Sequence, residues 1–188
     1  MNLLANLTFT NKRIESLDHL RGLAIFLMII VNSLSEYNNV PPWLKHAEWE
    51  GFTIADLVAP MFVFAMGIAY NLSFSRRVML QGKRRAILHS VRRYSILFIF
   101  GLIGAILVGK EVSLSHNVLQ MLGLVGLYSL PFMLIEPKSR VTIAFALAAI
   151  YNISTPFIIE PYSGSLLATL PWGFILLFAS ALGKSIYD

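Results

Sequence analysis

Cysteine is absent from all 188 residues, so disulfides and thiolate metal sites are both excluded. Charge is scarce as well: 13% of the residues are charged and 56% are hydrophobic, whereas about a quarter of a typical soluble domain is charged. Neither a phosphate-binding glycine loop nor a serine-hydrolase elbow is present, and the histidines are too scattered to predict a metal site (His19, His46, His89 and His116). This balance indicates a membrane protein.

Six apolar segments come close to the length that a bilayer requires. A hydrocarbon core of about 30 Å needs about 20 mostly apolar residues in a helix. Because a segment in lipid must satisfy its own backbone polar groups, each run is predicted to be helical. The sequence therefore predicts an all-α integral membrane bundle of about six transmembrane helices, forming one domain over residues 1–188. The predicted spans are Leu17–Tyr37, Ala55–Phe74, Tyr94–Gly109, Val118–Ile135, Val141–Ile159 and Leu166–Gly183.

The basic residues indicate an orientation in the membrane. A net charge of +5 first suggests nucleic acid, but the cations lie in loops between the apolar runs, so the predicted partner is the lipid bilayer and not nucleic acid. All of them except Lys45 and Lys110 fall on one side of the predicted spans. The positive-inside rule then places both termini in the cytoplasm, and we expect a plasma-membrane protein. The cluster Arg76–Arg93 admits two interpretations. It is either a topology signal that contacts anionic lipid headgroups, or a basic surface that attracts a polyanionic cofactor such as coenzyme A.

The candidate chemistry lies in the short polar stretch between the first two spans. Histidine is the residue type best suited to exchanging a proton at neutral pH, so His46 can act as a general base or accept an acyl group itself; the alternative is a solvated loop histidine. Asp56 opens the second span, where a carboxylate usually has a partner or a function. Thr53 and Asp56 also have the spacing of a capping box, so Asp56 is either a cap, a functional residue, or both.

Polar residues at the ends of other spans admit two interpretations each. Asn32 lies near the outer end of the first span. In a functional role it would orient a histidine or donate a hydrogen bond to a carbonyl oxygen; in a structural role it would hydrogen-bond to a neighbouring helix. Asn117 and Gln120 open the fourth span and admit the same two interpretations. Trp49 is suited to stacking on a sugar, although such residues more often form an interfacial belt. Arg21 is placed to pair with Asp18 three residues away or to meet a phosphate.

Three blocks of sequence form a pattern when taken together. The first is Arg13–Asn32, which contains Leu-Asp-His-Leu-Arg-Gly; the second is Lys45–Phe64, which begins Lys-His-Ala-Glu-Trp; the third is Val118–Gly123. These blocks resemble the heparan-α-glucosaminide N-acetyltransferase family. Their order and their placement on the predicted helices also match. The resemblance is dense over Arg13–Arg93, patchy to Tyr128 and weak afterwards.

The resemblance implies a transmembrane enzyme that transfers an acetyl group from cytosolic acetyl-CoA to an outward-facing saccharide or glycolipid. By that resemblance, the expected catalytic residues are His46, Asn32 and Asp56. Arg21, Asn117 and Gln120 are expected to bind the acetyl-CoA donor, and Trp49 the acceptor. The acceptor atom is an amine or a hydroxyl, and both direct transfer and an acyl-histidine intermediate remain open.

Family enzymes have roughly ten or eleven spans, whereas six are predicted here. There are three alternatives for the remaining spans. A second copy of the chain supplies them in a homodimer, another protein supplies them, or they are not replaced. Two functions other than acyl transfer also remain open. One is a membrane scaffold or partner subunit, and the other is a small-molecule permease, for which no acidic residue within a span core offers a proton relay.

Overall fold

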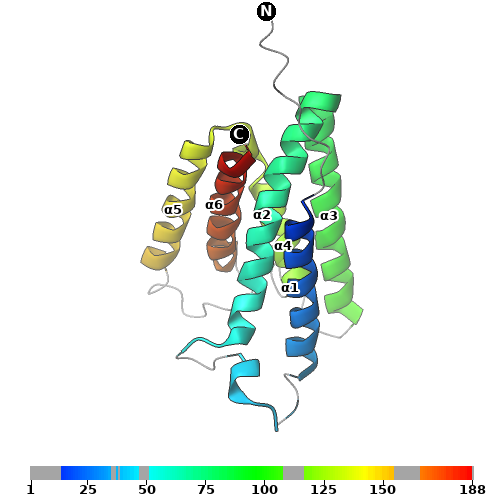
Figure 1. Ribbon diagram of the computed structural model, residues 1–188, viewed down its shortest axis with the longest axis vertical. Helices are drawn as coiled ribbons and strands as arrows, with labels where there is room; N and C mark the ends of the chain where they lie inside the picture. The colour runs from blue at the N-terminus through cyan, green and yellow to red at the C-terminus, as the bar shows by residue number, and fades with distance from the viewer. Residues whose placement is uncertain are drawn as a thin grey trace, which may run out of the picture.

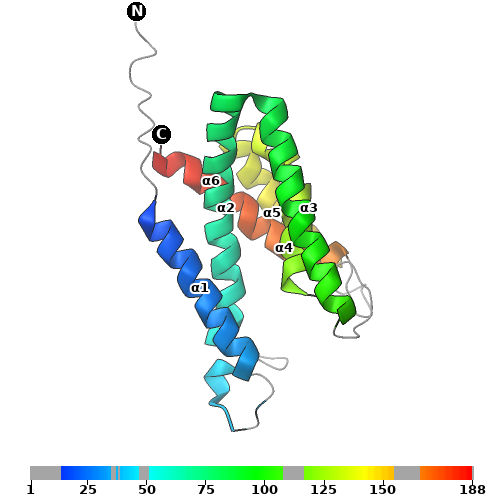
Figure 2. The ribbon, with the colours of Figure 1, turned by 90° about the vertical axis from the view of Figure 1, so that its right-hand side faces the viewer.

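The computed structural model describes residues 14–34, 37, 39–46, 51–107, 117–154 and 166–187, and this part of the chain is helical with no strand (Figures 1 and 2). This confirms the all-α prediction. The α-helices are α1 Glu15–Leu34, α2 Ile54–Gln81, α3 Lys83–Leu107, α4 Val118–Tyr128, α5 Pro137–Ser154 and α6 Leu170–Tyr187. Short 3-10 helices are η1 Pro42–Leu44, η2 Pro131–Leu134 and η4 Leu166–Thr169.

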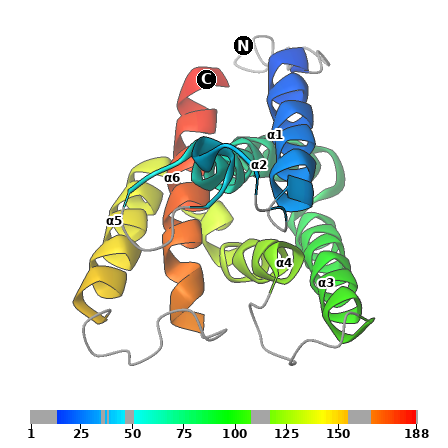
Figure 3. The ribbon, with the colours of Figure 1, turned by 90° about the horizontal axis from the view of Figure 1, so that it is seen from below.

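Helix α2 forms the centre of the bundle. Helices α1, α3 and α6 pack against it, while α4 packs on α3 and α5 packs on α6. Figure 3 shows α2 end-on, with α6 on one side and α1 and α3 on the other. The share of buried residues was compared over the most apolar segment of each long helix. It is 44% in α2, 22% in α3 and 11% in α1. Most of α1 and α3 therefore faces the surroundings rather than the protein.

The outward faces of α1 and α3 are apolar, as lipid requires. The exposed large side chains include Leu23, Ile25, Phe26 and Ile29 on α1, and Ile99, Phe100, Ile103 and Ile106 on α3. Contiguous apolar surface of this kind is rare on soluble monomers and is natural against lipid tails. Helices α1, α2 and α3 are long and apolar enough to cross a membrane, and two shorter apolar helices accompany them in the described part of the chain. The membrane bundle is thereby confirmed.

A tight turn at Gly82 joins α2 to α3, at the top of Figure 1. Its φ of +86° suits glycine, and its N–H donates to the Val78 carbonyl at 3.0 Å. The basic residues before the third predicted span, which starts at Tyr94, were counted as a loop, and this was wrong, because α3 begins at Lys83. Arginine and lysine are good helix formers, so the chain stays helical through its basic residues except at Gly82.

The α-helix of the fourth predicted span is, by contrast, shorter than expected. Helix α4 ends at Tyr128, and η2 continues from Pro131 instead of an α-helix that reaches Ile135. Proline has no N–H for the carbonyl four residues earlier, but it fits the first position of a new helical turn. The sixth span likewise begins as the 3-10 helix η4 before α6.

Arg140 is buried inside the bundle, although its position in the sequence suggested a loop cation. Only 3% of the residue is exposed. Its Nη1 donates to the Asn71 Oδ1 at 2.6 Å, its Nη2 to the Met133 carbonyl at 3.2 Å and its Nε to the Ile135 carbonyl at 3.1 Å. The guanidinium thus joins α5 to α2 and satisfies carbonyls at the end of η2, where a cation is favoured.

Glycine at position 67 allows α2 and α6 to approach closely. A Cβ at this position would lie 2.5 Å from the Leu176 carbonyl oxygen and 2.9 Å from the Ala179 Cβ. Small residues commonly permit such contacts between membrane helices. The packing of the two helices therefore depends on the absence of a side chain here.

We expect Gly67→Ala to destabilise the protein by roughly 1–3 kcal/mol, because the added methyl overpacks the α2–α6 contact. Gly104→Ala on α3 is the matched control, since nothing lies within 4 Å of a Cβ there. It should be neutral or stabilise the protein by up to about 1 kcal/mol through helix propensity. Unfolding in detergent measures both variants, and equal stability of the two would contradict the close-packing explanation.

Candidate active site

The end of α1 and the start of α2 meet at one end of the bundle. Val31 of α1 packs against Ala55 and Val58 of α2 in a small apolar cluster. Asn32 follows Val31 in the last turn of α1, and Asp56 lies in the first turn of α2. The apolar contact therefore brings two of the predicted site residues to the same end of the molecule, at the bottom of Figure 2.

Two prolines shape the segment that carries His46. Pro41 has the fixed φ of its ring, −52°, and precedes the short helix η1, which begins at Pro42. The N–H of Leu44 donates to the Pro41 carbonyl at 3.0 Å, and that of Lys45 to the Pro42 carbonyl at 3.2 Å. Because η1 also contacts α2, this turn positions His46 close to the start of α2.

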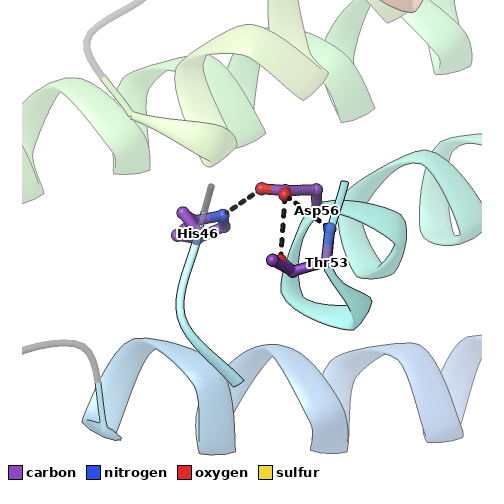
Figure 4. Close-up of polar contacts among 3 residues, drawn as sticks. All are labelled: His46, Thr53 and Asp56. Carbon is purple, nitrogen blue, oxygen red and sulfur yellow. Dashed lines mark hydrogen bonds and ion pairs between the residues drawn. The ribbon is translucent and has the colours of Figure 1, made fainter. Parts of the chain in front are cut away.

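His46 and Asp56 form a direct contact. The His46 Nδ1 lies 2.7 Å from the Asp56 Oδ1 (Figure 4). The other carboxylate oxygen, Oδ2, accepts hydrogen bonds from the Thr53 N–H at 3.1 Å and the Thr53 Oγ1 at 2.9 Å. The two interpretations of Asp56 from the sequence therefore use different atoms: Oδ2 belongs to the helix cap, and Oδ1 holds the imidazole.

This contact determines which imidazole nitrogen is available for chemistry. An ionised carboxylate only accepts hydrogen bonds, so Nδ1 carries the proton and donates it to Asp56. In the neutral ring Nε2 then has the free lone pair. The His46 side chain is 56% exposed and that of Asp56 is 25% exposed, so the base is open to a ligand while its carboxylate is largely covered. The pair has the arrangement of a general base with an orienting carboxylate.

Asn32 and Arg21 occupy different levels of α1. Asn32 is exposed in the last turn, on the same end as the imidazole. Arg21 lies about 16 Å away along the helix axis, at 1.5 Å per residue. Its Nη1 is 3.9 Å from the Asp18 Oδ1, so the ion pair expected from their spacing is present. The predicted catalytic residues and the predicted donor-binding arginine are thus separated along the bundle.

Asn117 and Gln120 form the cap of α4. The Asn117 Oδ1 accepts from the Gln120 N–H at 2.9 Å, and the Asn117 N–H donates to the Gln120 Oε1 at 3.3 Å. The Asn117 Nδ2 also donates to the Gly101 carbonyl at 2.7 Å, which fastens α4 to α3. Gln120 is fully buried. These bonds give both residues a structural role, and their donor-binding role remains a prediction.

Of the two tryptophans near this end, only one can be placed. Trp49 lies outside the described residues, so its predicted contact with an acceptor remains a prediction. Trp43 belongs to η1 and is 53% exposed.

Sequence reasoning did not single out Tyr94, a buried residue of α3. Its one sequence signal is its position directly after Arg92 and Arg93, at the point where the apolar part of the helix begins.

The helical bundle and the imidazole–carboxylate pair define a class of protein. It is an integral membrane protein that has a histidine paired with an aspartate at one end of its helices. A family model described as heparan-alpha-glucosaminide N-acetyltransferase, catalytic, matches residues 13–188. The chain therefore belongs to this family, which confirms the resemblance in its sequence blocks.

Named relatives match shorter parts of the chain. Human heparan-alpha-glucosaminide N-acetyltransferase is 47% identical over 64 residues, which are 34% of this chain and 9% of the human protein. Its mouse counterpart is 45% identical over 64 residues, with the same coverage. A Bacillus acidopullulyticus protein, described as an uncharacterized 39.9 kDa protein in the amylase 3′ region, is 35% identical over 98 residues, 50% of this chain and 28% of that protein. The match thus spans less than a third of each relative.

Proposed function

We propose that this chain is a membrane-embedded acetyl- or acyltransferase that uses cytosolic acetyl-CoA as the donor. The acceptor is an amine or hydroxyl of a saccharide or glycolipid on the opposite side of the membrane. One observation carries the proposal: the His46–Asp56 pair, 2.7 Å apart, lies at the end of the bundle away from the arginine-rich α2–α3 turn. Membership of an N-acetyltransferase family supports acyl transfer as the reaction.

The length of α2 supports a reaction across the membrane. Between Asp56 and Arg76 the helix rises about 30 Å at 1.5 Å per residue, which equals the thickness of a bilayer core, about 30 Å. The positive-inside rule assigns the arginine-rich end and both termini to the cytoplasm. His46 then faces the other side, and we assign the protein to the plasma membrane.

His46 acts as the base in this proposal. Its Nε2 accepts the proton of the acceptor amine or hydroxyl while the acceptor oxygen or nitrogen bonds to the thioester carbonyl carbon. Asp56 stabilises the imidazolium that forms, and the amide of Asn32 or Asn117 donates to the oxyanion. The carbon–sulfur bond then breaks, and the coenzyme A thiolate leaves and takes up a proton. In the alternative order, Nε2 attacks the thioester first and passes the acyl group on.

The remaining predicted residues have binding roles. Arg21 binds a phosphate of the donor at the cytoplasmic half of α1. Asn117 and Gln120 contact the donor near the start of α4, because the Asn117 amide has a second N–H beyond the one donated to Gly101. Trp49 stacks on the acceptor sugar. Because family members have more spans, we propose that a second copy of the chain completes the site as a homodimer.

The test is acetyl transfer by the purified full chain in proteoliposomes. Labelled acetyl-CoA is supplied on one side, and glucosamine on the other. We expect time-dependent labelling of glucosamine when the donor is on the side of the α2–α3 turn, and none when the two compartments are exchanged. N-acetylglucosamine, whose amine is blocked, is the control for transfer to nitrogen. Absence of both transfer and a thermal shift with acetyl-CoA would favour a scaffold, and glucosamine uptake without a donor would favour a permease.

A further inference from the structure

The apolar outer surface of the bundle continues as far as the His46–Asp56 pair. Leu57, which follows Asp56 on α2, is 48% exposed, and Ile54 in the same turn is 50% exposed. Because a helix rises 1.5 Å per residue, both lie within about 3 Å of Asp56 along the axis of α2. Exposed apolar surface on a membrane helix faces lipid, so the pair lies level with the edge of the lipid and not above it in water.

Aromatic side chains extend this surface beyond the start of α2. Phe52 directly precedes the capping residue Thr53 and is 71% exposed. Trp43 is exposed on η1, which contacts α2 and ends two residues before His46. Tryptophan is enriched at the boundary between lipid and water. Exposed apolar or aromatic side chains therefore lie on both segments that carry the pair, at the depth of the lipid headgroups.

The charges near the pair do not suit a polyanionic acceptor. Residues 44–56 include one basic residue, Lys45, against three acidic ones, Glu48, Glu50 and Asp56. Sulfated or carboxylated saccharides are bound through clustered arginine and lysine. In this chain such a cluster lies around the α2–α3 turn, at the opposite end of the bundle (Figure 1). A neutral or amine-bearing sugar meets no such repulsion at the His46 end.

We propose that the acceptor is a glycolipid, a neutral or amine-bearing sugar carried on an alkyl or acyl chain; this rests on the proposed function and names the substrate class of the same site. The lipid chain lies in the leaflet at this end of the bundle, against Ile54 and Leu57. Phe52 and Trp43 border the sugar, whose amine or hydroxyl reaches the His46 Nε2 from the side. The acyl group replaces one hydrogen of that amine or hydroxyl, and coenzyme A leaves as the thiol.

The first experiment compares dodecyl glucosaminide with glucosamine as acceptors for the full chain in proteoliposomes, with acetyl-CoA on the side of the α2–α3 turn. We expect kcat/KM to be at least about tenfold higher for the lipid acceptor, since each CH₂ placed in the membrane adds about fourfold to binding. Phe52→Ser and Ile54→Ser should each lower this preference about tenfold, mainly through the KM of the lipid acceptor, as loss of an apolar contact does. Two variants are used so that a folding defect in one leaves the test intact.

Ile153→Ser is the matched control for these variants. Ile153 is 69% exposed near the end of α5, on another helix that faces the surroundings. Its substitution should leave the preference between the two acceptors unchanged. Equal use of the two acceptors by wild type, or the same shift in preference in all three variants, would overturn the proposal, because the apolar residues near His46 would then act only as general membrane anchors.

A second experiment tests glycolipid binding without requiring acyl transfer. Dodecyl glucosaminide with a diazirine in its chain is activated by light in the presence of the full chain, and the labelled peptides are identified by mass spectrometry. Excess unmodified dodecyl glucosaminide should reduce labelling of the peptides that contain Trp43 or Leu57, whereas dodecanol, which lacks the sugar, should not. Absence of this competition overturns the glycolipid site even if glucosamine is acetylated. Competition without transfer to either acceptor supports the glycolipid site and contradicts the proposed transferase.

Discussion

His46→Ala is expected to lower acetyl transfer by about 10²–10⁴-fold, the contribution typical of a positioned general base. If His46 carries the acyl group itself, the loss is at least as large. The side chain is 56% exposed and outside the main core, so its removal leaves the helical packing intact. Initial rates with labelled acetyl-CoA measure the effect, and thermal unfolding in detergent confirms that the variant is folded.

His89→Ala is the matched control for this substitution. His89 is also an exposed histidine, but it lies on α3 near the arginine-rich turn, at the other end of the bundle. It should retain transfer within about twofold of wild type. Full activity of His46→Ala, or an equal loss in the two variants, would rule out His46 as the reacting imidazole.

Asp56→Asn should also reduce transfer by roughly 10²–10⁴-fold, because it reverses the tautomer of His46. The asparagine oxygen is still able to accept from the Thr53 N–H and preserve the helix cap. Its NH₂ group then faces the His46 Nδ1, which must accept instead of donate. The proton moves to Nε2, the atom that has to be unprotonated in a base. Rates with saturating donor test this, with circular dichroism as the check on the helix.

Thr53→Ala separates the cap from the chemistry at this site. It removes the 2.9 Å hydrogen bond to the Asp56 Oδ2 but leaves the Oδ1 contact with His46 in place. Loss of an N-cap hydroxyl costs roughly 0.5–2 kcal/mol of stability, and we expect most of the activity to remain. The opposite pattern, with Thr53→Ala inactive and Asp56→Asn active, would mean that Asp56 acts only as a cap.

Much of the fold follows from local features of the sequence. Apolar runs became helices because lipid leaves the backbone no other way to satisfy its polar groups. The Thr53–Asp56 spacing predicted a cap, and the family resemblance named His46 and Asp56 among the residues of one site; the structure has them 2.7 Å apart. Their catalytic roles remain predictions. Local spacing also predicted the Asp18–Arg21 pair.

Features that depend on distant partners were not predictable in this way. Arg140 was counted as a loop cation because nothing near it in the sequence indicates that Asn71 and the Met133 carbonyl will surround it. The buried position of Tyr94 depends on Gly126, which leaves room for the ring, while the nearby Gly126 carbonyl accepts the hydroxyl of Tyr70. Periodicity and composition describe a helix and its environment, whereas these positions are decided by contacts between helices.

The one-residue connection at Gly82 also bears on how the protein enters the membrane during synthesis. Because only Gly82 connects α2 to α3, the connection is too short for one helix to span the bilayer while the other stays outside it. The cations on both sides of the turn resist passage through hydrocarbon. The two helices are therefore expected to insert together as a hairpin, with the turn left on the side from which the ribosome delivers it.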